Sequence, residues 1–435
     1  MAQFICRYTG RIAWRVKMKS IEKFSVLLLT SLFLITNQGL AQDKNAKIES
    51  VKLSGNVYKF VLNDIVNVIA LVGPDGVLLV DSGFDKNPAN GFINSPAAIK
   101  EELKKIGNDS IKYIIDTHTD NDHAYGNAEL GQNATIIAQQ LGRERLLGIR
   151  QFPGQGLPNL TFQDSLQLYF NNEEISVFYL PGHTNHDIVV HFKNAKIVCV
   201  GDLIIPDSFG SISRTGNVHA MIKAMDILDK RFADDVTFIA GHDRNLQKKD
   251  LMPYKDMIEK TLAIIEKEIK NGKNLEQMQK EDILKSWRKW DGVLFKELDA
   301  NGWITMIYTN IIKKLKPSAA EKLGEILRRS GYGPAKDDIH VLLSRKTRYY
   351  FVEAEFNILG YDLINEGKLN DAIEAFKITV GLYPDSWNAY DSLGEAYALA
   401  GNKELAIENY ERSLKLNPGS PSGINALKQL NAKTN

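Results

Sequence analysis

The segment Asp116–Asn127, with the sequence DTHTDNDHAYGN, gathers carboxylate and imidazole groups within twelve residues. It includes His118, Asp120, Asp122 and His123, and it follows the apolar run KYII. Imidazole and carboxylate are the ligands that zinc and similar divalent ions prefer. A metal site needs more ligands than these two histidines supply, so the interpretation requires further candidates elsewhere in the chain.

Further candidates occur where other apolar runs end. They are Asp81 in LLVDSG, His183 in LPGHTNHD, Asp202 in CVGDL and His242 in IAGHD. Loops at strand ends hold side chains on a rigid frame while leaving them open to solvent. Together with Asp116–Asn127, these residues predict a metal centre built from five separated segments.

The elements that must position these residues have the pattern of an α/β domain. From Val57 to about His242, short β-branched runs alternate with helical or turn-rich pieces. The predicted strands are VYKFVL, IVNVIALV, GVLLVD, IKYIID, ATIIA, ISVFYL, DIVVHF, KIVCVGD and VTFIAGH. Most are apolar without clean alternation, as strands covered on both faces are. We therefore expect sheets sandwiched between helices.

From about Lys248 the pattern becomes helical, through the runs LMPYKDMIEKTLAIIEKEIKNGK, EDILKSWRKW, WITMIYTNIIKKLK and AAEKLGEILRRSG. The last eighty residues then repeat at a spacing of 34, as Gly360 and Gly394 illustrate. A fixed period of this length predicts a solenoid. The order of aromatic, Leu-Gly, Ala, aromatic and Pro closely resembles the tetratricopeptide repeat. We expect two such units, a capping helix in SGINALKQL, and support from the preceding helices, since two repeats are too few to be stable alone.

The ordered motifs Asp, His-x-Asp-x-Asp-His, His, Asp and His resemble the metallo-β-lactamase superfamily over about residues 50–245. The resemblance implies an αββα sandwich, followed here by an all-α region, and a centre with two divalent ions. Zinc is the first choice, with iron or manganese as alternatives. By analogy, one ion is bound by His118, Asp120 and His183, the other by Asp122, His123 and His242, with Asp202 bridging them and Asp81 orienting ligands from behind.

Asp120 departs from the family pattern, which has a second histidine at this position. A carboxylate can still bind the ion, but the added negative charge lowers the Lewis acidity of the metal and favours harder ions. Whether the first site fills completely stays open. Some zinc β-lactamases have a cysteine at the position of Asp202, whereas glyoxalase II-like hydrolases have an aspartate. At this position the chain therefore resembles the glyoxalase II-like hydrolases.

The resemblance predicts hydrolysis of an ester, thioester, lactone or amide by a metal-bound hydroxide, which Asp122 would orient and deprotonate. One alternative is a scaffold protein whose repeats do the biological work and whose metal site is vestigial. Another is a zinc β-lactamase. Arg214 is either a substrate contact or a solvated loop charge. The remaining histidines of this region, His186, His191 and His219, have structural roles in this interpretation.

The first residues have the pattern of a secretory signal. A basic segment beginning at Met18, the apolar run SVLLLTSLFLIT and a small-residue cleavage site predict removal after Ala41, with Met18 as a candidate true start. The alternative is an uncleaved membrane anchor. We therefore expect a secreted, periplasmic protein with no membrane span after signal removal. Only Cys199 would remain as a buried core thiol, without a disulfide.

The predicted domains are a signal peptide at 1–41, a metallo-β-lactamase-like domain at 42–247, a helical extension at 248–352, two repeats at 353–420 and a cap and tail at 421–435. Lys and Arg number 54 and Asp and Glu 53, so the charge balance gives no reason to expect nucleic acid as a partner. The expected partners are a small-molecule substrate and, through the repeats, another protein or a second copy of the chain.

Overall fold

A computed structural model of the chain describes residues 47–84, 95–149, 152–295 and 298–432. The predicted signal segment lies outside these residues. Residues Asp43–Asn435 form one compact unit, so the predicted domain limits within it stay predictions. In the part of the chain that the structure describes, no helix combines the length and the apolar character needed to cross a bilayer.

The first sheet contains the strands of the N-terminal half in sequential order. They are β1 (Ile48–Ser54), β2 (Val57–Leu62), β3 (Val66–Gly73), β4 (Gly76–Val80), β5 (Ile111–Ile115), β6 (Thr135–Gln139) and β7 (Leu160–Phe162). β1 to β4 pair antiparallel, and β4 to β7 pair parallel. The parallel pairing brings the carboxyl ends of β4 and β5 to the same edge of the sheet.

The second sheet follows the order β13-β12-β11-β10-β9-β8. Its strands are β8 (Ser165–Phe170), β9 (Glu173–Tyr179), β10 (Ile188–Phe192), β11 (Ile197–Gly201), β12 (Thr237–Ala240) and β13 (Asn245–Gln247). β11 and β12 are parallel, so their carboxyl ends also meet at one edge. The nine predicted strands are confirmed within one or two residues, and β1, β7, β8 and β13 were not predicted.

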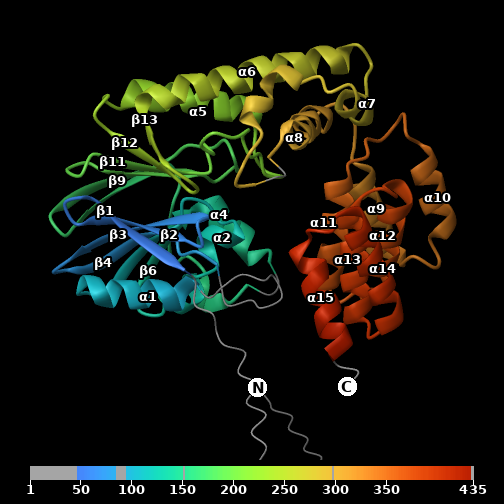
Figure 1. Ribbon diagram of the computed structural model, residues 1–435, viewed down its shortest axis with the longest axis horizontal. Coiled ribbons are helices and arrows are strands. Elements are labelled where there is room, and N and C mark those ends of the chain that lie inside the picture. The colour runs from blue at the N-terminus through green and yellow to red at the C-terminus, as the bar shows by residue number, and fades with distance from the viewer. Residues whose placement is uncertain (1–46, 85–94, 150–151, 296–297, 433–435) are drawn as a thin grey trace, which may run out of the picture. The chain divides into compact units, whose positions relative to one another are not determined.

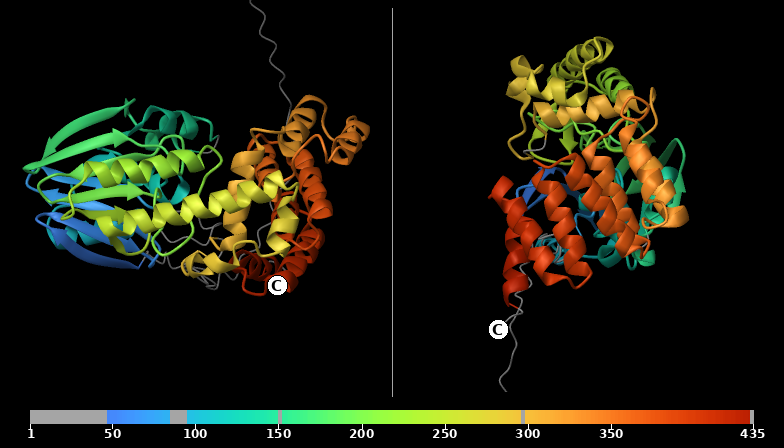
Figure 2. Two further views of the ribbon diagram at one scale, coloured as in Figure 1. Left: turned by 90° about the horizontal axis from the view of Figure 1, so that it is seen from above. Right: turned by 90° about the vertical axis from the view of Figure 1, so that its right-hand side faces the viewer.

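Three apolar layers hold this domain together. Ile69 and Val80 of the first sheet pack against Val190 and Ile239 of the second, within one buried cluster. On the outer side of the first sheet lies α1 (Ser95–Ile106), in a separate cluster. On the outer side of the second lie α5 (Val218–Arg231) and α6 (Lys248–Lys270), in one cluster with α8 (Ala300–Ile312), which packs against α6. Figure 1 shows this order of helix, sheet, sheet and helices, and the view from above in Figure 2 shows α5 and α6 lying across the strands; this arrangement confirms the predicted αββα sandwich.

The remaining short helices of the α/β domain follow the strands closely. They are α2 (Asn121–Ala124) and α3 (Asn127–Leu130) after β5, α4 (Gln140–Leu147) after β6, and the 3-10 turn η2 (Gly154–Gly156) before β7. Asp120 is the N-cap of α2, which contains Asp122 and His123. Three of the four candidate ligands of the segment Asp116–Asn127 therefore lie at one short helical turn after β5, and His118 lies in the loop before it.

The helical extension contains the predicted helices with one difference, and it also contains α7 (Leu275–Lys280) and α10 (Lys336–Ser344), which were not predicted. After α6 come α7 (Leu275–Lys280), the 3-10 helix η3 (Lys285–Trp290) and α8, although EDILKSWRKW was expected to be an α-helix. The prediction of a helix is confirmed for Lys285–Trp290, as a 3-10 helix. It is wrong for the residues before Lys285, because Asp282 has a positive φ of 50°, which no residue inside a right-handed α-helix can adopt. The helical conformation is interrupted at Asp282, and the chain continues as the 3-10 helix η3.

The C-terminal region confirms the two predicted repeat units. They are α11 (Glu353–Asn365) with α12 (Leu369–Leu382), and α13 (Trp387–Leu399) with α14 (Lys403–Leu416), followed by the cap α15 (Pro421–Ala432). One buried cluster joins them to α9 (Ala319–Ser330) and α10 (Lys336–Ser344). The repeats therefore lean on the preceding helices, as two isolated units would have to.

The repeat glycines yield a prediction because their surroundings differ. A Cβ at Gly360 would overlap the buried ring of Phe376, whereas a Cβ at Gly394 would come no closer than 3.1 Å to the Tyr410 ring. Overpacking costs roughly 1–3 kcal/mol, and alanine recovers about 1 kcal/mol of helix propensity. Gly360→Ala should therefore lower the stability of the full chain in thermal unfolding followed by circular dichroism, and Gly394→Ala should be nearly neutral. Equal effects at the two positions would contradict this packing.

Candidate metal centre

The loops at the strand ends bring the candidate ligands together. Asp81 follows β4, Asp202 follows β11, and His242 comes two residues after β12. His183 lies in the loop between β9 and β10. The carboxyl ends of the parallel strands of both sheets therefore lie near the same place. Loops at such strand ends commonly build the functional sites of α/β proteins.

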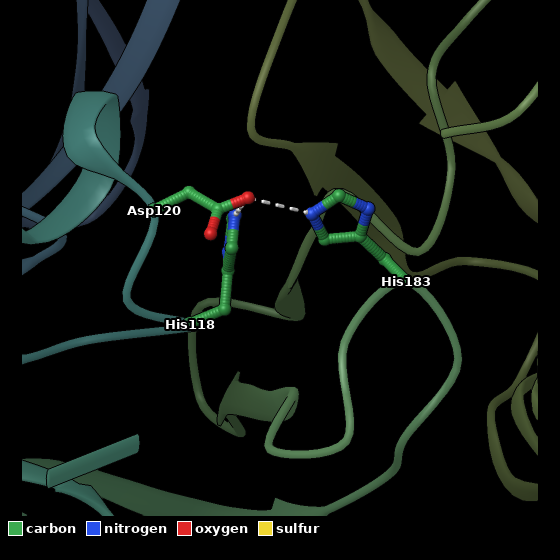
Figure 3. A group of neighbouring side chains, drawn as sticks. All are labelled: His118, Asp120 and His183. Atoms are coloured by element: carbon green, nitrogen blue, oxygen red, sulfur yellow. Dashed lines mark hydrogen bonds and ion pairs between the residues drawn. The ribbon is translucent and has the colours of Figure 1, made fainter. Parts of the chain in front are cut away.

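The first group consists of His118, Asp120 and His183, which Figure 3 shows pointing toward one another. Asp120 Oδ2 lies 3.1 Å from His183 Nε2 and 3.8 Å from His118 Nε2. Both histidine side chains are buried, and the aspartate is one quarter exposed. The departure from the family motif therefore places an oxygen where it faces two imidazole nitrogens.

The second group consists of Asp122, His123 and His242. Asp122 Oδ2 lies 3.5 Å from His123 Nε2 and 3.4 Å from His242 Nε2. Asp202 lies between the two groups: its Oδ1 is 3.5 Å from His123 Nε2, and its Oδ2 is 3.2 Å from His242 Nε2 and 3.9 Å from His118 Nε2. Every residue predicted as a ligand is thus part of one cluster, with Asp202 in a bridging position.

The outward-facing nitrogen of each clustered histidine has a partner that accepts a hydrogen bond. The Nδ1 partners are Thr117 Oγ1 for His118 (3.1 Å), Asp81 Oδ2 for His123 (2.8 Å), the Ser211 carbonyl for His183 (3.0 Å) and the Ile65 carbonyl for His242 (2.8 Å). The Thr117 hydroxyl gives its own proton to Asp81 and is left to accept from His118. All four rings can therefore donate from Nδ1, and the Nε2 atom of each faces the centre, where it can bind a metal ion once it carries no proton.

The centre fits a cation. Within the described residues, the Nε2 atoms of His118 and His123 and Oδ1 of Asp202 are buried without a hydrogen-bond partner. Buried polar atoms without partners are rare and costly, and each demands an explanation. The ligand atoms lie within 4.8 Å of one another in the first group, in the second group, and in the set formed by His118, His123 and Asp202. A nitrogen and oxygen donor set of this kind suits zinc, iron or manganese.

The electrostatics of the cluster also favour positive charge. Burial opposes ionisation of Asp120, but its hydrogen bond with His183 and the charges of His118 and Arg145 outweigh burial and lower the pKa of Asp120. Burial likewise opposes protonation of His183, yet Asp120 and Asp202 raise the pKa of His183 to about 10. The His183 proton thus occupies the place that a metal ion would take, and metal binding must release it.

Asp81 lies behind the cluster and connects two of its histidines. Its Oδ1 accepts the Thr117 backbone N–H (2.7 Å), and its Oδ2 accepts the Thr117 hydroxyl (2.8 Å) and contacts His123 Nδ1. A chain of hydrogen bonds thus runs from His118 through Thr117 and Asp81 to His123. The sequence indicated Asp81 in this orienting role but gave no sign of Thr117.

Two further residues at the centre were not predicted. Arg145 of α4 forms an ion pair with Asp120, and Phe295, in the loop after η3, lies edge-on to His242 with 4.8 Å between ring centroids. Neither stands in a recognisable motif, since their approach depends on how α4 and the helical extension pack. Of the residues without an assigned ligand role, His186 is buried against Thr119 Oγ1 at 2.9 Å.

The remaining polar residues singled out in the sequence lie elsewhere. His191 belongs to β10, as predicted, and His219 is exposed in the first turn of α5. Arg214 is exposed and pairs with Glu321 at 3.3 Å, in keeping with a surface charge. Asp116, the first carboxylate of the opening segment, accepts both its hydrogen bonds from Asn127 Nδ2. It therefore supports the loop and does not enter the cluster.

Comparison with known proteins supports this assignment of the fold. Residues 62–242 match the Metallo-beta-lactamase superfamily, and residues 359–421 match the Tetratricopeptide repeat. A hydroxyacylglutathione hydrolase from Pelagibacter ubique (strain HTCC1062) is 26% identical over 203 residues, which are 43% of this chain and 81% of that protein.

Two solved structures are also similar. A metallo-beta-lactamase from Pontibacter korlensis has 17% identity and a TM-score of 0.42, covering 49% of this chain and 99% of that one. The DIM-1 metallo-beta-lactamase exposed to ceftazidime has 18% identity and a TM-score of 0.42, covering 50% of this chain and 97% of that one.

The hydrogen-bond chain behind the ligands yields a second prediction. Asp81→Asn should weaken zinc binding by about 10–100-fold, as loss of an orienting partner typically does. Thr117→Val should weaken it less, because His123 keeps its carboxylate. Asp116→Asn is the matched control, since this buried carboxylate does not touch a ligand. Titration of the metal-free protein against a chromophoric chelator measures all three, and an unchanged affinity in Asp81→Asn would refute the orienting role.

Proposed function

We propose that this chain, whose residues 62–242 form a metallo-beta-lactamase superfamily domain followed by tetratricopeptide repeats at residues 359–421, is a zinc-dependent hydrolase of ester, thioester, lactone or amide bonds. The observation that carries the proposal is the pair of His/Asp groups sharing Asp202, with the imidazole Nε2 atoms turned inward. Two cations side by side are a standard device for hydrolysis.

The residues divide into two ligand sets. His118, Asp120 and His183 would hold one ion, Asp122, His123 and His242 the other, and Asp202 would contact both. When bound, such ions lower the pKa of water toward neutrality and polarise the carbonyl of the substrate. The ring hydrogen bonds fix each imidazole before substrate arrives, so little reorganisation is needed during the reaction.

Asp122 is the residue placed to handle a proton. Its side chain is 18% exposed, and its Oδ2 faces both His123 and His242. A carboxylate at this position can orient the attacking water and accept its proton, as a general base must. Phe295 lies against His242 and gives this side of the centre an apolar wall, which excludes water and strengthens the charges within.

A thioester is the first substrate class to test. The relative from Pelagibacter ubique carries the name hydroxyacylglutathione hydrolase, and Asp202 places a carboxylate at the bridging position. The acyl group is a separate choice, because it depends on the loops around the centre. Esters and lactones react through the same kind of carbonyl group and complete the panel of test substrates. A β-lactam is included to test the alternative, a zinc β-lactamase.

We also propose a cellular location and binding partners for the protein. The signal-like segment before residue 42 supports secretion to a periplasm. Helical repeats stack into surfaces that take up peptides or neighbouring proteins, so the C-terminal region would bind a protein partner or a second copy of the chain. The enzyme would then act on a small molecule at one site and engage a protein through another part.

The proposal predicts a metal-dependent activity. Protein loaded with zinc should hydrolyse at least one thioester, ester or lactone, lose that activity on chelation and regain it when zinc is restored. His242→Ala should lower kcat/KM by at least about 100-fold, because one ligand set loses a member. His219→Ala, an exposed histidine outside the cluster, is the control and should leave kcat/KM unchanged.

Two results would contradict the proposal. One is a purified protein that retains less than about half an equivalent of transition metal and takes up no more, which favours the scaffold alternative. The other is a protein with two bound ions that hydrolyses no member of the panel.

A further inference from the structure

Asp120 uses its two oxygen atoms differently. Oδ2 faces the histidines, at 3.1 Å from His183 Nε2 and 3.8 Å from His118 Nε2. Oδ1 turns the other way and lies 2.9 Å from Arg145 Nη2. The contact with Arg145 has the distance of an ion pair without the alignment of a hydrogen bond. The carboxylate therefore presents one oxygen to the centre while a cation holds the other.

Arg145 also contacts the motif His-x-Asp-x-Asp-His through Thr119. Its Nη1 donates to the Thr119 carbonyl and lies 3.2 Å from Thr119 Oγ1. Thr119 stands between His118 and Asp120, and its hydroxyl also contacts His186 Nε2 at 2.9 Å. The planar guanidinium thus reaches Asp120 and the adjacent peptide at once, a geometry that the single ammonium group of lysine reproduces only in part.

Helix α4 (Gln140–Leu147) can bring Arg145 this close because it packs tightly on the motif. A Cβ on Gly142, one turn earlier, would lie 3.1 Å from both Thr119 Cγ2 and His186 Cδ2. The absence of a side chain at this position lets the helix approach. The Arg145 side chain is 37% exposed, so it stands at the rim of the centre and not in its interior.

The charges explain what such a contact could achieve. Where the family pattern has a neutral histidine, Asp120 adds one negative charge to a centre that already holds Asp122 and Asp202. Arg145 adds one positive charge beside it. The guanidinium also restricts a short side chain that would otherwise rotate freely, because it fixes the oxygen that does not face the histidines.

We infer that Arg145 is a positioning residue that makes Asp120 an effective metal ligand in place of the usual histidine. It holds Oδ2 toward His118 and His183 and offsets the extra carboxylate charge. The inference rests on the proposed metal-dependent function, and it concerns how the first ligand group binds its ion. It assigns a role to a helix that carries no part of the recognised motifs.

Two opposing effects decide what loss of Arg145 does to zinc affinity. Removing a cation next to the ligands should strengthen binding, but a partly exposed ion pair changes an equilibrium by only about fivefold at most. Losing the orientation of a ligand weakens binding by about 10–100-fold. The orientation effect is larger, so Arg145→Met should bind zinc more weakly at one of its two sites.

The test is zinc affinity measured by competition with a chromophoric chelator on the full chain. Arg145→Met should lose about tenfold or more at one site, and Arg145→Lys should recover part of that loss. Arg143→Met is the matched control on the same helix, because Arg143 donates to the Pro158 carbonyl, outside the ligand cluster, and it should bind zinc like the unmodified protein. The cobalt(II) absorption spectrum gives a second readout of the ligand set, independent of hydrolysis.

A double-mutant comparison separates positioning from a general role in folding. In the Asp120→His background the ligand is neutral and needs no cationic partner, so adding Arg145→Met should leave zinc affinity unchanged or raise it. An equal loss in both backgrounds would show that Arg145 only stabilises α4 and would overturn the inference. If circular dichroism shows that Arg145→Met does not fold, Arg145→Lys takes its place in the comparison. Asp120→Asn then serves as a further variant with a neutral side chain at position 120.

Other outcomes are equally decisive. Zinc affinity in Arg145→Met within about twofold of the unmodified protein overturns the inference, as does a raised KM with unchanged zinc affinity, which would make Arg145 a substrate contact. If the unmodified protein binds no zinc at all, the proposed function fails as well. The failure of one claim can therefore be distinguished from the failure of the other.

Discussion

The structure depends on a cluster of buried imidazole and carboxylate groups that the protein alone does not satisfy. Hydrogen bonds to Thr117, Asp81 and two backbone carbonyls occupy the outer nitrogens of the four rings. Within the residues that the structure describes, the inward-facing Nε2 atoms of His118 and His123 have no hydrogen-bond partner. Burying such groups without partners costs free energy, which a bound cation would return. The two stacked sheets and their covering helices give this cluster a rigid frame.

Much of the arrangement could be predicted because ligand chemistry and strand position coincide in the sequence. Asp81, Asp202 and His242 each follow an apolar run, and parallel strands bring such ends to one edge. The edge strands β1, β7, β8 and β13 were missed because they are short, partly exposed or weakly apolar. The break at Asp282 was missed because a single positive φ leaves no periodic signal.

The residues that surround the ligands could not be predicted for a different reason. Arg145 contacts Asp120 only because α4 packs closely on the motif, and Phe295 reaches His242 from a segment more than fifty residues farther along the chain. Thr117 resembles any polar residue near a strand end. These contacts depend on tertiary packing, whereas the ligands depend on local pattern. The contact between Asp120 and Arg145 therefore comes from the fold and not from the sequence next to Asp120.

The most direct test of the central claim is anomalous X-ray diffraction from crystals of the zinc-loaded protein, collected on both sides of the zinc absorption edge. The account predicts two anomalous peaks about 3.5–4 Å apart. One should lie among His118, Asp120 and His183, the other among Asp122, His123 and His242, with Asp202 reaching both. Fully loaded crystals without a peak at this cluster, or with zinc bound only elsewhere, would contradict it.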